Sequence, residues 1–501
     1  NGLSSQGTIK LDGNYPVGSD NVMLGENAGA SLTSGGSNNA FGAYALDGNT
    51  EGSNNVALGR AALGANTTAS NNTAVGYHAL TANTTGAGNS AVGKTTLQSN
   101  TTGANNTAVG LQALNGNTTA ADNTAVGMNA LVTNTTGASN TAVGRSALQE
   151  STTASNNTAV GYEALKDNTT GVNNTSVGSQ SAQNNTTGAR NVSMGQASLA
   201  TNTTGSNNIA LGYAALYTNS SGASNVAVGT NALSLSTVSD NTAVGFSALE
   251  VNTTGRINTA VGKNSMLANT TGADNSAFGG LTLDANTTGN SNTALGYASL
   301  SASTTASNNT AVGSLALTNN TTGDKNVTLG GSSGLDNTTG RLNTFVGYNS
   351  GANNTTASSN TFMGESAGFT NTTGAYNTAI GQAALVFNTT ASNNTAVGYS
   401  SLSSNTTGTR NTGIGAYTLT DNTTGANNTA LGISAVQNTT TGNSNTGIGD
   451  RALDANTTGS NNTAIGFMAL RASTTSGSNT AVGYQAGYSN TTGFSNIFMG
   501  V

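Results

Sequence analysis

Few residues in this chain have the side chains that catalysis usually needs. The 501 residues include one histidine, His78, no cysteine and only 6% charged residues. Two pairs of nearby carboxylates, Glu150 with Glu163 and Asp450 with Asp454, have the residue types of a glycosidase, in which two carboxyl groups flank the bond that breaks. Neither pair carries a motif beyond proximity. We therefore expect solvated surface charges, and the chain is predicted not to be an enzyme.

Metal and phosphate sites are not predicted either. Calcium-binding repeats place Asp in coils of the type Gly-Gly-x-Gly-x-Asp. Here no slot of the repeat holds Asp in two successive coils, since Asp167, Asp284 and Asp336 lie far apart. The many glycines are not followed by helices, as they are in phosphate-binding loops. We expect neither a metal nor another cofactor.

The segment Asn-Thr-Thr recurs along the chain and has the form of an N-glycosylation acceptor. Asn and Thr are also ordinary turn formers, and in a protein of bacterial origin we expect that simpler role. A eukaryotic or archaeal source would favour glycosylation instead. Stacked threonines can also bind ice, but a Thr-x-Thr strand is not the repeated feature, so ice binding is not expected. The candidate glycosylation sites considered are Asn83, Asn100, Asn117 and Asn134.

A regular repeat accounts for most of these residues. The pentad Asn-x-x-x-Gly occurs 29 times, from Asn21–Gly25 to Asn496–Gly500, at intervals of 17 residues with one interval of 16. So short and regular a period is typical of a solenoid. Residues 21–501 are therefore predicted to form one all-β solenoid, a β-roll of about 29 coils. Residues 1–20 are predicted to be an atypical N-terminal cap or junction.

The pentad itself predicts a strand. Its fourth position is always apolar and its second is usually Thr, Val or Ile, so we expect these two side chains to face inward. The pentad Asn never varies, which predicts a ladder of Asn side chains bonded from coil to coil. The predicted structural ladder comprises Asn72, Val75, Gly76, Leu80, Asn89, Val92, Gly93, Leu97, Asn106, Val109, Gly110 and Leu114.

The other side of the predicted strand is small and uncharged. The third pentad position is normally Ala, and no pentad contains a charged residue. A surface of this kind indicates the close approach of another backbone. We therefore expect the Ala and Gly side of the strand to pack against a partner chain in a homo-oligomer.

Leu stands four residues after the pentad Gly in most coils, but five coils have Gly there. In these coils the next residue is apolar or aromatic, and two of them carry Phe345 or Phe362 inside the pentad. Because cores are close-packed, we expect these residues to replace the missing Leu volume. Residues 330–370 are predicted to form a locally different layer. The five glycines are Gly29, Gly334, Gly351, Gly368 and Gly487.

Charge and hydropathy exclude two classes of partner. The net charge is −6 with charges scattered singly, so no basic stripe for nucleic acid exists. No run of 18 apolar residues could span a bilayer. The chain begins with Asn and stops one residue after a pentad, so we expect a processed or truncated chain that continues beyond Val501.

The repeat resembles a known family. The pentads Asn72–Gly76 and Asn106–Gly110, with the trailing segments 77–80 and 111–114, are similar to the head repeats of trimeric autotransporter adhesins (YadA-like heads). Those repeats have an Asn-Ser-Val-Ala-Ile-Gly-type strand in each coil, and the resemblance covers about residues 21–501. It implies a parallel homotrimer of β-rolls in an extracellular, cell-surface fibre that binds surfaces, glycan or host matrix. The familiar repeat is shorter, because the Asn-Thr-Thr-Gly turn lengthens each coil here.

The expected function is therefore that of a structural or adhesive extracellular fibre, a stiff rod for surface attachment. Similar repeats occur in bacteriophage tail fibres and other large bacterial surface proteins, so a receptor-binding tail fibre is one alternative. A self-assembling extracellular filament, with subunits joined end to end, is another. In all three the first partner is the chain itself.

Overall fold

The computed structural model describes residues 18–500, which form strands and turns. The chain divides into two compact units, Asn1–Phe246 and Ser247–Val501. Each unit is an all-β solenoid with one three-residue strand per coil, which confirms the predicted fold class and the repeat of about 17 residues. The predicted cap, residues 1–20, lies almost entirely outside the described residues.

The strands coincide with the second to fourth positions of the pentad. In the first unit they are β1 (Val22–Leu24), β2 (Asn39–Phe41), β3 (Val56–Leu58), β4 (Thr73–Val75), β5 (Ser90–Val92), β6 (Thr107–Val109), β7 (Thr124–Val126), β8 (Thr141–Val143), β9 (Thr158–Val160), β10 (Thr175–Val177), β11 (Val192–Met194), β12 (Ile209–Leu211), β13 (Val226–Val228) and β14 (Thr242–Val244). In the second unit they are β15 (Thr259–Val261), β16 (Ser276–Phe278), β17 (Thr293–Leu295), β18 (Thr310–Val312), β19 (Val327–Leu329), β20 (Thr344–Val346), β21 (Thr361–Met363), β22 (Thr378–Ile380), β23 (Thr395–Val397), β24 (Thr412–Ile414), β25 (Thr429–Leu431), β26 (Thr446–Ile448), β27 (Thr463–Ile465), β28 (Thr480–Val482) and β29 (Ile497–Met499).

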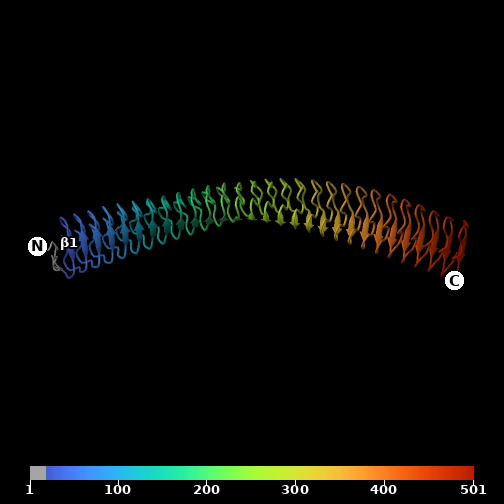
Figure 1. Ribbon diagram of the computed structural model, residues 1–501, viewed down its shortest axis with the longest axis horizontal. Coiled ribbons are helices and arrows are strands. Elements are labelled where there is room, and N and C mark those ends of the chain that lie inside the picture. The colour runs from blue at the N-terminus through green and yellow to red at the C-terminus, as the bar shows by residue number, and fades with distance from the viewer. Residues whose placement is uncertain (1–17, 501) are drawn as a thin grey trace, which may run out of the picture. The chain divides into compact units, whose positions relative to one another are not determined.

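Within each unit, every strand pairs in parallel with the strand of the next coil. The register sets each residue beside its equivalent one coil later, so that Ala74 pairs with Ala91 and Val75 with Val92. Figure 1 shows the coils of each unit following one another in chain order. Like side chains therefore stack on like along every column of the repeat, which is the geometry that a ladder requires.

The strand faces the opposite way from the sequence prediction. The third-position Ala, such as Ala74 and Ala91, is fully buried within its own coil. The fourth-position Val92 and Val109 are 39% and 38% exposed, and Val75 is only partly buried. The expectations that the apolar residues face inward and that the Ala side meets a partner chain are both wrong.

The reason is the small space inside the coil. The Leu of the opposite wall, for example Leu80, Leu97 and Leu114, is fully buried, as predicted. The backbone of these leucines is left-handed, with φ of 51° at Leu80, which costs about 1–2 kcal/mol for a non-glycine residue. Full burial of a Leu side chain, worth about 1.5–3 kcal/mol, offsets that cost. Once Leu fills the interior, only a small residue, usually Ala, fits on the strand that faces it.

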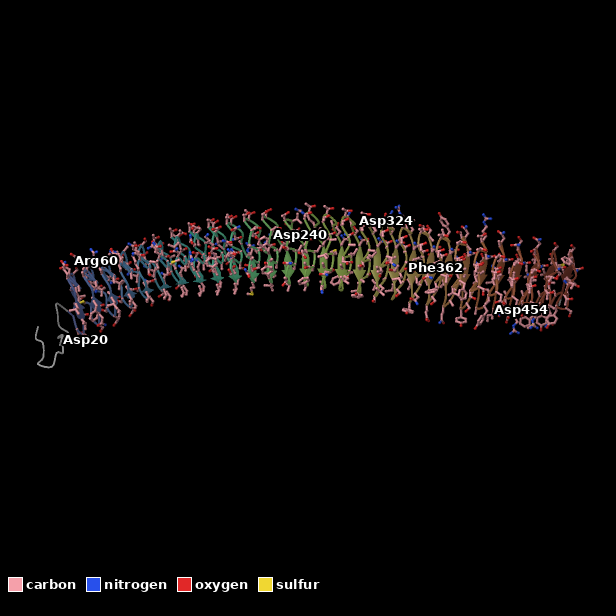
Figure 2. The ribbon with its side chains drawn as sticks, turned by 45° about the horizontal axis from the view of Figure 1, so that its top comes forward. Asp20, Arg60, Asp240, Asp324, Phe362 and Asp454 are labelled. Atoms are coloured by element: carbon pink, nitrogen blue, oxygen red, sulfur yellow. The ribbon has the colours of Figure 1, made fainter. Side chains whose placement is uncertain are left out.

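The coils with Gly in place of Leu support this explanation. Phe345 and Phe362 are fully buried, and their rings stack with centroids 5.3 Å apart. A Cβ built on Gly351 would lie only 2.8 Å from the Phe345 ring. The large inward residue therefore occupies the volume that Leu fills elsewhere. Figure 2 marks Phe362 among the side chains of the second unit.

Replacing Phe345 tests this exchange of volume. Phe345→Ala is expected to lower local stability by about 3–5 kcal/mol, because it leaves a cavity beside Gly351. Adding Gly351→Leu should recover part of the loss, since it restores the Ala and Leu pair of the ordinary coil. Hydrogen exchange of peptides from 330–370 measures both effects. Tyr348→Ala, at a side chain that is 60% exposed in the same coil, is the control. Unchanged protection in Phe345→Ala would refute the explanation.

Candidate functional site

The pentad Asn side chains form the predicted ladder. The backbone N–H of Asn89 donates to Oδ1 of Asn72 at 2.9 Å, and Asn106 donates to Asn89 in the same way at 3.0 Å. The side-chain Nδ2 of each Asn donates across its own coil, from Asn72 to the carbonyl of Gly86 at 3.0 Å. Each side-chain amide thus bonds its coil to the next through Oδ1 and bridges its own coil through Nδ2. The Asn ladder is confirmed.

A second Asn ladder runs through the turns, where the sequence predicted only turn formers. Nδ2 of Asn83 donates to Oδ1 of Asn66 at 2.9 Å and to the carbonyl of Gly86, also at 2.9 Å. The Gly86 carbonyl therefore accepts from both the pentad Asn and the turn Asn of its coil. One backbone oxygen joins the two ladders in this coil.

The turn threonines continue this network in the other direction. Oγ1 of Thr84 donates to the carbonyl of Thr101 in the next coil at 3.0 Å. The same contact recurs from Thr101 to Thr118. The sequence did not reveal this role, because Thr is common in any exposed turn. The signal that could have shown it is the constant place of the first Thr after each turn Asn.

The turn ladder is interrupted where Ser or Thr replaces the turn Asn. In each such coil the replacement leaves the preceding Asn with a buried Oδ1 that has no hydrogen-bond partner. A buried acceptor without a donor costs about 1–3 kcal/mol. The replaced positions are Ser151, Ser236, Ser303, Thr439 and Ser473, and the corresponding Asn residues are Asn134, Asn219, Asn286, Asn422 and Asn456.

The four candidate glycosylation sites all belong to the turn ladder. Their side chains are fully buried. Their Nδ2 atoms donate to the carbonyl three residues ahead, as in Asn100 to Gly103 at 2.9 Å. Glycosylation needs that nitrogen, so it would have to occur before the coil closes. The four residues are Asn83, Asn100, Asn117 and Asn134.

The outward side of the strands forms a continuous uncharged surface in each unit, with one apolar column beside a column that is mostly Thr and Ser. We call it the strand face and define it as the side chains at the second and fourth pentad positions of β1–β14 and of β15–β29. It carries Thr, Ser, Val and Ile in one column, with a single Asn39, and Val, Leu, Ile, Met or Phe in the other. Leu58 and Leu295 are each 48% exposed. No charged side chain stands on it.

An exposed aromatic column lies just beyond the strand face. The residue after the pentad Gly is aromatic in many coils, and each of these rings is at least 38% exposed. Phe467 and Tyr484 stack on each other with centroids 5.4 Å apart. The aromatic residues of this column are Tyr77, Tyr162, Tyr213, Phe246, Tyr297, Tyr348, Tyr399, Phe467 and Tyr484.

The candidate catalytic residues lie in small surface clusters. The His78 ring contacts Tyr77 with centroids 4.1 Å apart, and its Nδ1 lies 3.3 Å from Oγ1 of Thr81. Glu163 forms an ion pair of 3.8 Å with Lys166. Burial alone raises the pKa of Glu163, but hydrogen bonds from Tyr162 and Gln180 and the charge of Lys166 bring the pKa below its ordinary value. Glu163 is therefore ionised at neutral pH and is not suited to donate a proton.

In the second pair of carboxylates, Asp454 also interacts with neighbouring side chains. Burial raises the pKa of Asp454, and the nearby Arg471 opposes that shift. Nε of Arg471 lies 3.6 Å from Asp454, while its Nη1 donates to the Tyr488 hydroxyl at 2.8 Å. Figure 2 labels Asp454 in the second unit. The row Asp454, Arg471 and Tyr488 runs across three successive coils and joins them at the surface.

The structural class of this protein is assigned from its fold and its Asn ladders. Within residues 18–500 there is no group of three or more His, Cys, Asp or Glu side chains placed to hold a metal ion. In that part of the chain, no helix is long and apolar enough to cross a membrane. No protein-family model matches the chain, and no curated protein matches it. The class that the fold defines is that of β-solenoid repeat proteins with stacked Asn ladders.

Completing the turn ladder should stabilise the solenoid locally. Ser303→Asn supplies a donor for the buried Oδ1 of Asn286, so we expect a gain of about 1 kcal/mol. An Asn is compatible with Ala three residues later, because Nδ2 of Asn66 donates to the carbonyl of Ala69. Ser303 has Ala306 at the same spacing. Hydrogen exchange around 286–303 measures the gain. Asn100→Ser, which creates the same gap beside Asn83, should have the opposite effect. A loss of protection in Ser303→Asn would contradict the assignment.

Proposed function

We propose that this chain is a structural or adhesive component of an extracellular, cell-surface fibre. The observation that carries the proposal is the pentad Asn ladder, which bonds each coil to the next without interruption in each unit. Such stacking yields a long, stiff repeat whose coils contact only their neighbours. The resemblance to YadA-like head repeats agrees with this use.

We further propose that the chain self-associates through the strand face, as a parallel homotrimer. Large apolar patches on soluble proteins mark interaction surfaces. A second copy of the same chain fits best, because its strand face has the same period, so side chains can interdigitate coil by coil. The absence of charge from the strand face removes electrostatic repulsion between copies.

Charges placed on the strand face test this interface. The variant Val109→Glu/Val126→Glu/Val143→Glu buries three carboxylates in the proposed contact and should convert a trimer to a monomer. The matched control is Thr119→Glu/Thr136→Glu/Thr153→Glu, which adds the same charge to exposed turn positions nearby. Light scattering gives the stoichiometry, and far-UV circular dichroism checks that the solenoid remains folded.

The outcomes separate cleanly. A trimeric wild type and control with a monomeric strand-face variant support the interface. A monomeric wild type would refute self-association, and a strand-face variant that stays trimeric would place the contact elsewhere. Location is tested separately by antibody labelling of intact cells that produce the chain. Labelling that appears only after the cells are permeabilised would refute the extracellular assignment.

A further inference from the structure

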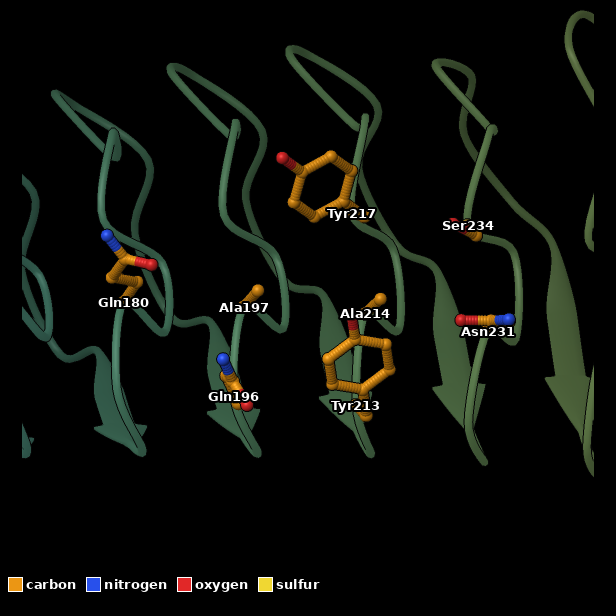
Figure 3. Close-up of a pocket in the computed structure, with 8 residues that line it drawn as sticks. All are labelled: Gln180, Gln196, Ala197, Tyr213, Ala214, Tyr217, Asn231 and Ser234. Carbon is orange, nitrogen blue, oxygen red and sulfur yellow. The ribbon is translucent and has the colours of Figure 1, made fainter.

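A shallow groove crosses the surface of the first unit beside the coils of β10 to β13. It is lined by side chains at the two positions after the pentad Gly and at the fifth position after it. Figure 3 shows Tyr213 and Tyr217 on one coil, with the amides of Gln180 and Gln196 on the preceding coils and Asn231 on the next. The remaining lining residues are Ala197, Ala214 and Ser234.

The groove exists because two successive coils carry Ala where others carry longer side chains. Ala197 and Ala214 stand at the second residue after the pentad Gly, and both have left-handed backbones with φ of 56° and 52°. The same column holds Gln180 and Asn231 on either side. The two Ala methyl groups therefore form the floor of the groove, between the amides of Gln180 and Asn231. Tyr213 and Tyr217 line the groove beside this floor.

The polar groups of the groove are available to a ligand. Tyr213 is 54% exposed and Tyr217 is 40% exposed. Within residues 18–500, no side-chain hydrogen bond engages the two tyrosine hydroxyls or the amides of Gln196 and Asn231. Gln180 is the exception, since its Nε2 donates to Glu163 at 3.3 Å. Phenol and amide groups each donate and accept hydrogen bonds.

This combination selects a class of ligand. All eight lining residues are uncharged, which gives no counter-charge for a phosphate or another ion. Aromatic faces pack against apolar surfaces, while groups that both donate and accept match a ligand rich in hydroxyls. A sugar ring offers a C–H face and a rim of hydroxyls. The groove extends over three coil steps, roughly 14 Å at the spacing of strands in a sheet, which suits a chain of sugars better than a single one.

We propose that this groove binds a neutral oligosaccharide or polysaccharide, with Tyr213 and Tyr217 as the packing surface and the amides of Gln196 and Asn231 as hydrogen-bonding groups. The inference rests on the proposed adhesive function and names its ligand. The groove lies off the strand face, so saccharide and partner chain occupy different surfaces. Ala197 and Ala214 determine access, because a longer side chain at either place would fill the floor.

Electrophoresis in native gels that contain a polysaccharide tests the proposal on the full chain. The probes are four neutral polymers, namely mannan, dextran, xyloglucan and soluble starch, with pectin as the anionic comparison. We expect at least one neutral polymer to retard the wild type. Tyr213→Ala/Tyr217→Ala should weaken the apparent affinity about tenfold or more, because it removes the whole packing surface.

Two further variants make the result specific. Ala214→Gln keeps both tyrosines but fills the floor, and Gln is accommodated with the same backbone at Gln180, where φ is 57°. It should weaken the apparent affinity in the same way. Tyr297→Ala, at a ring in the equivalent column that is 58% exposed, should bind as the wild type does.

Three results would overturn the site: no retardation of the wild type by any neutral polymer, retardation by pectin alone, or an apparent affinity that Tyr213→Ala/Tyr217→Ala leaves unchanged. Light scattering on the same samples separates this failure from failure of the proposed fibre. The groove variants are expected to keep the stoichiometry of the wild type. Any of these three results in samples with an intact oligomer therefore rejects the saccharide site alone.

Discussion

The structure depends on hydrogen bonds that buried amides make between equivalent residues of successive coils. A coil of 17 residues has three-residue strands, too short for backbone pairing alone to hold it. The pentad Asn adds a bond to the next coil and a bond across its own, as Asn72 does with Asn89 and Gly86. The shorter coil at 225–240 keeps this pattern, since Asn225 donates to Val238 at 2.8 Å. The turn can lose a residue, but the bond across the coil remains.

Several features could be predicted from the sequence because they follow from repetition. The strand position, the inward Leu column represented by Leu80 and the Asn ladder through Asn72 all rest on residue types that hardly vary between coils. In-register stacking places a constant residue in a column, so the same contact recurs from coil to coil. The exchange between Phe345 and Gly351 followed from the same logic, since close packing conserves volume.

The side of the strand that faces inward could not be predicted by hydrophobicity. A three-residue strand gives one inward side chain and two outward ones, or the reverse, and neither side carries charge to decide between them. The deciding quantity was the space left by the opposite wall. That space depends on left-handed residues such as His78 and Leu80, with φ of 58° and 51°, which sequence reasoning does not expect at non-glycine positions. The groove at Tyr213 was missed for a related reason, because it depends on which columns of the repeat face solvent.

The directions of the side-chain bonds give the stack a polarity. Amide hydrogens of the turn Asn residues point toward the preceding coil, as from Asn83 to Asn66, whereas the hydroxyl hydrogen of Thr84 points toward the following one. The two surfaces of a coil are therefore chemically unlike, and each is complementary only to the opposite surface of another coil. An inverted coil would set donor against donor and acceptor against acceptor. A coil of this type can consequently add to a stack in only one orientation.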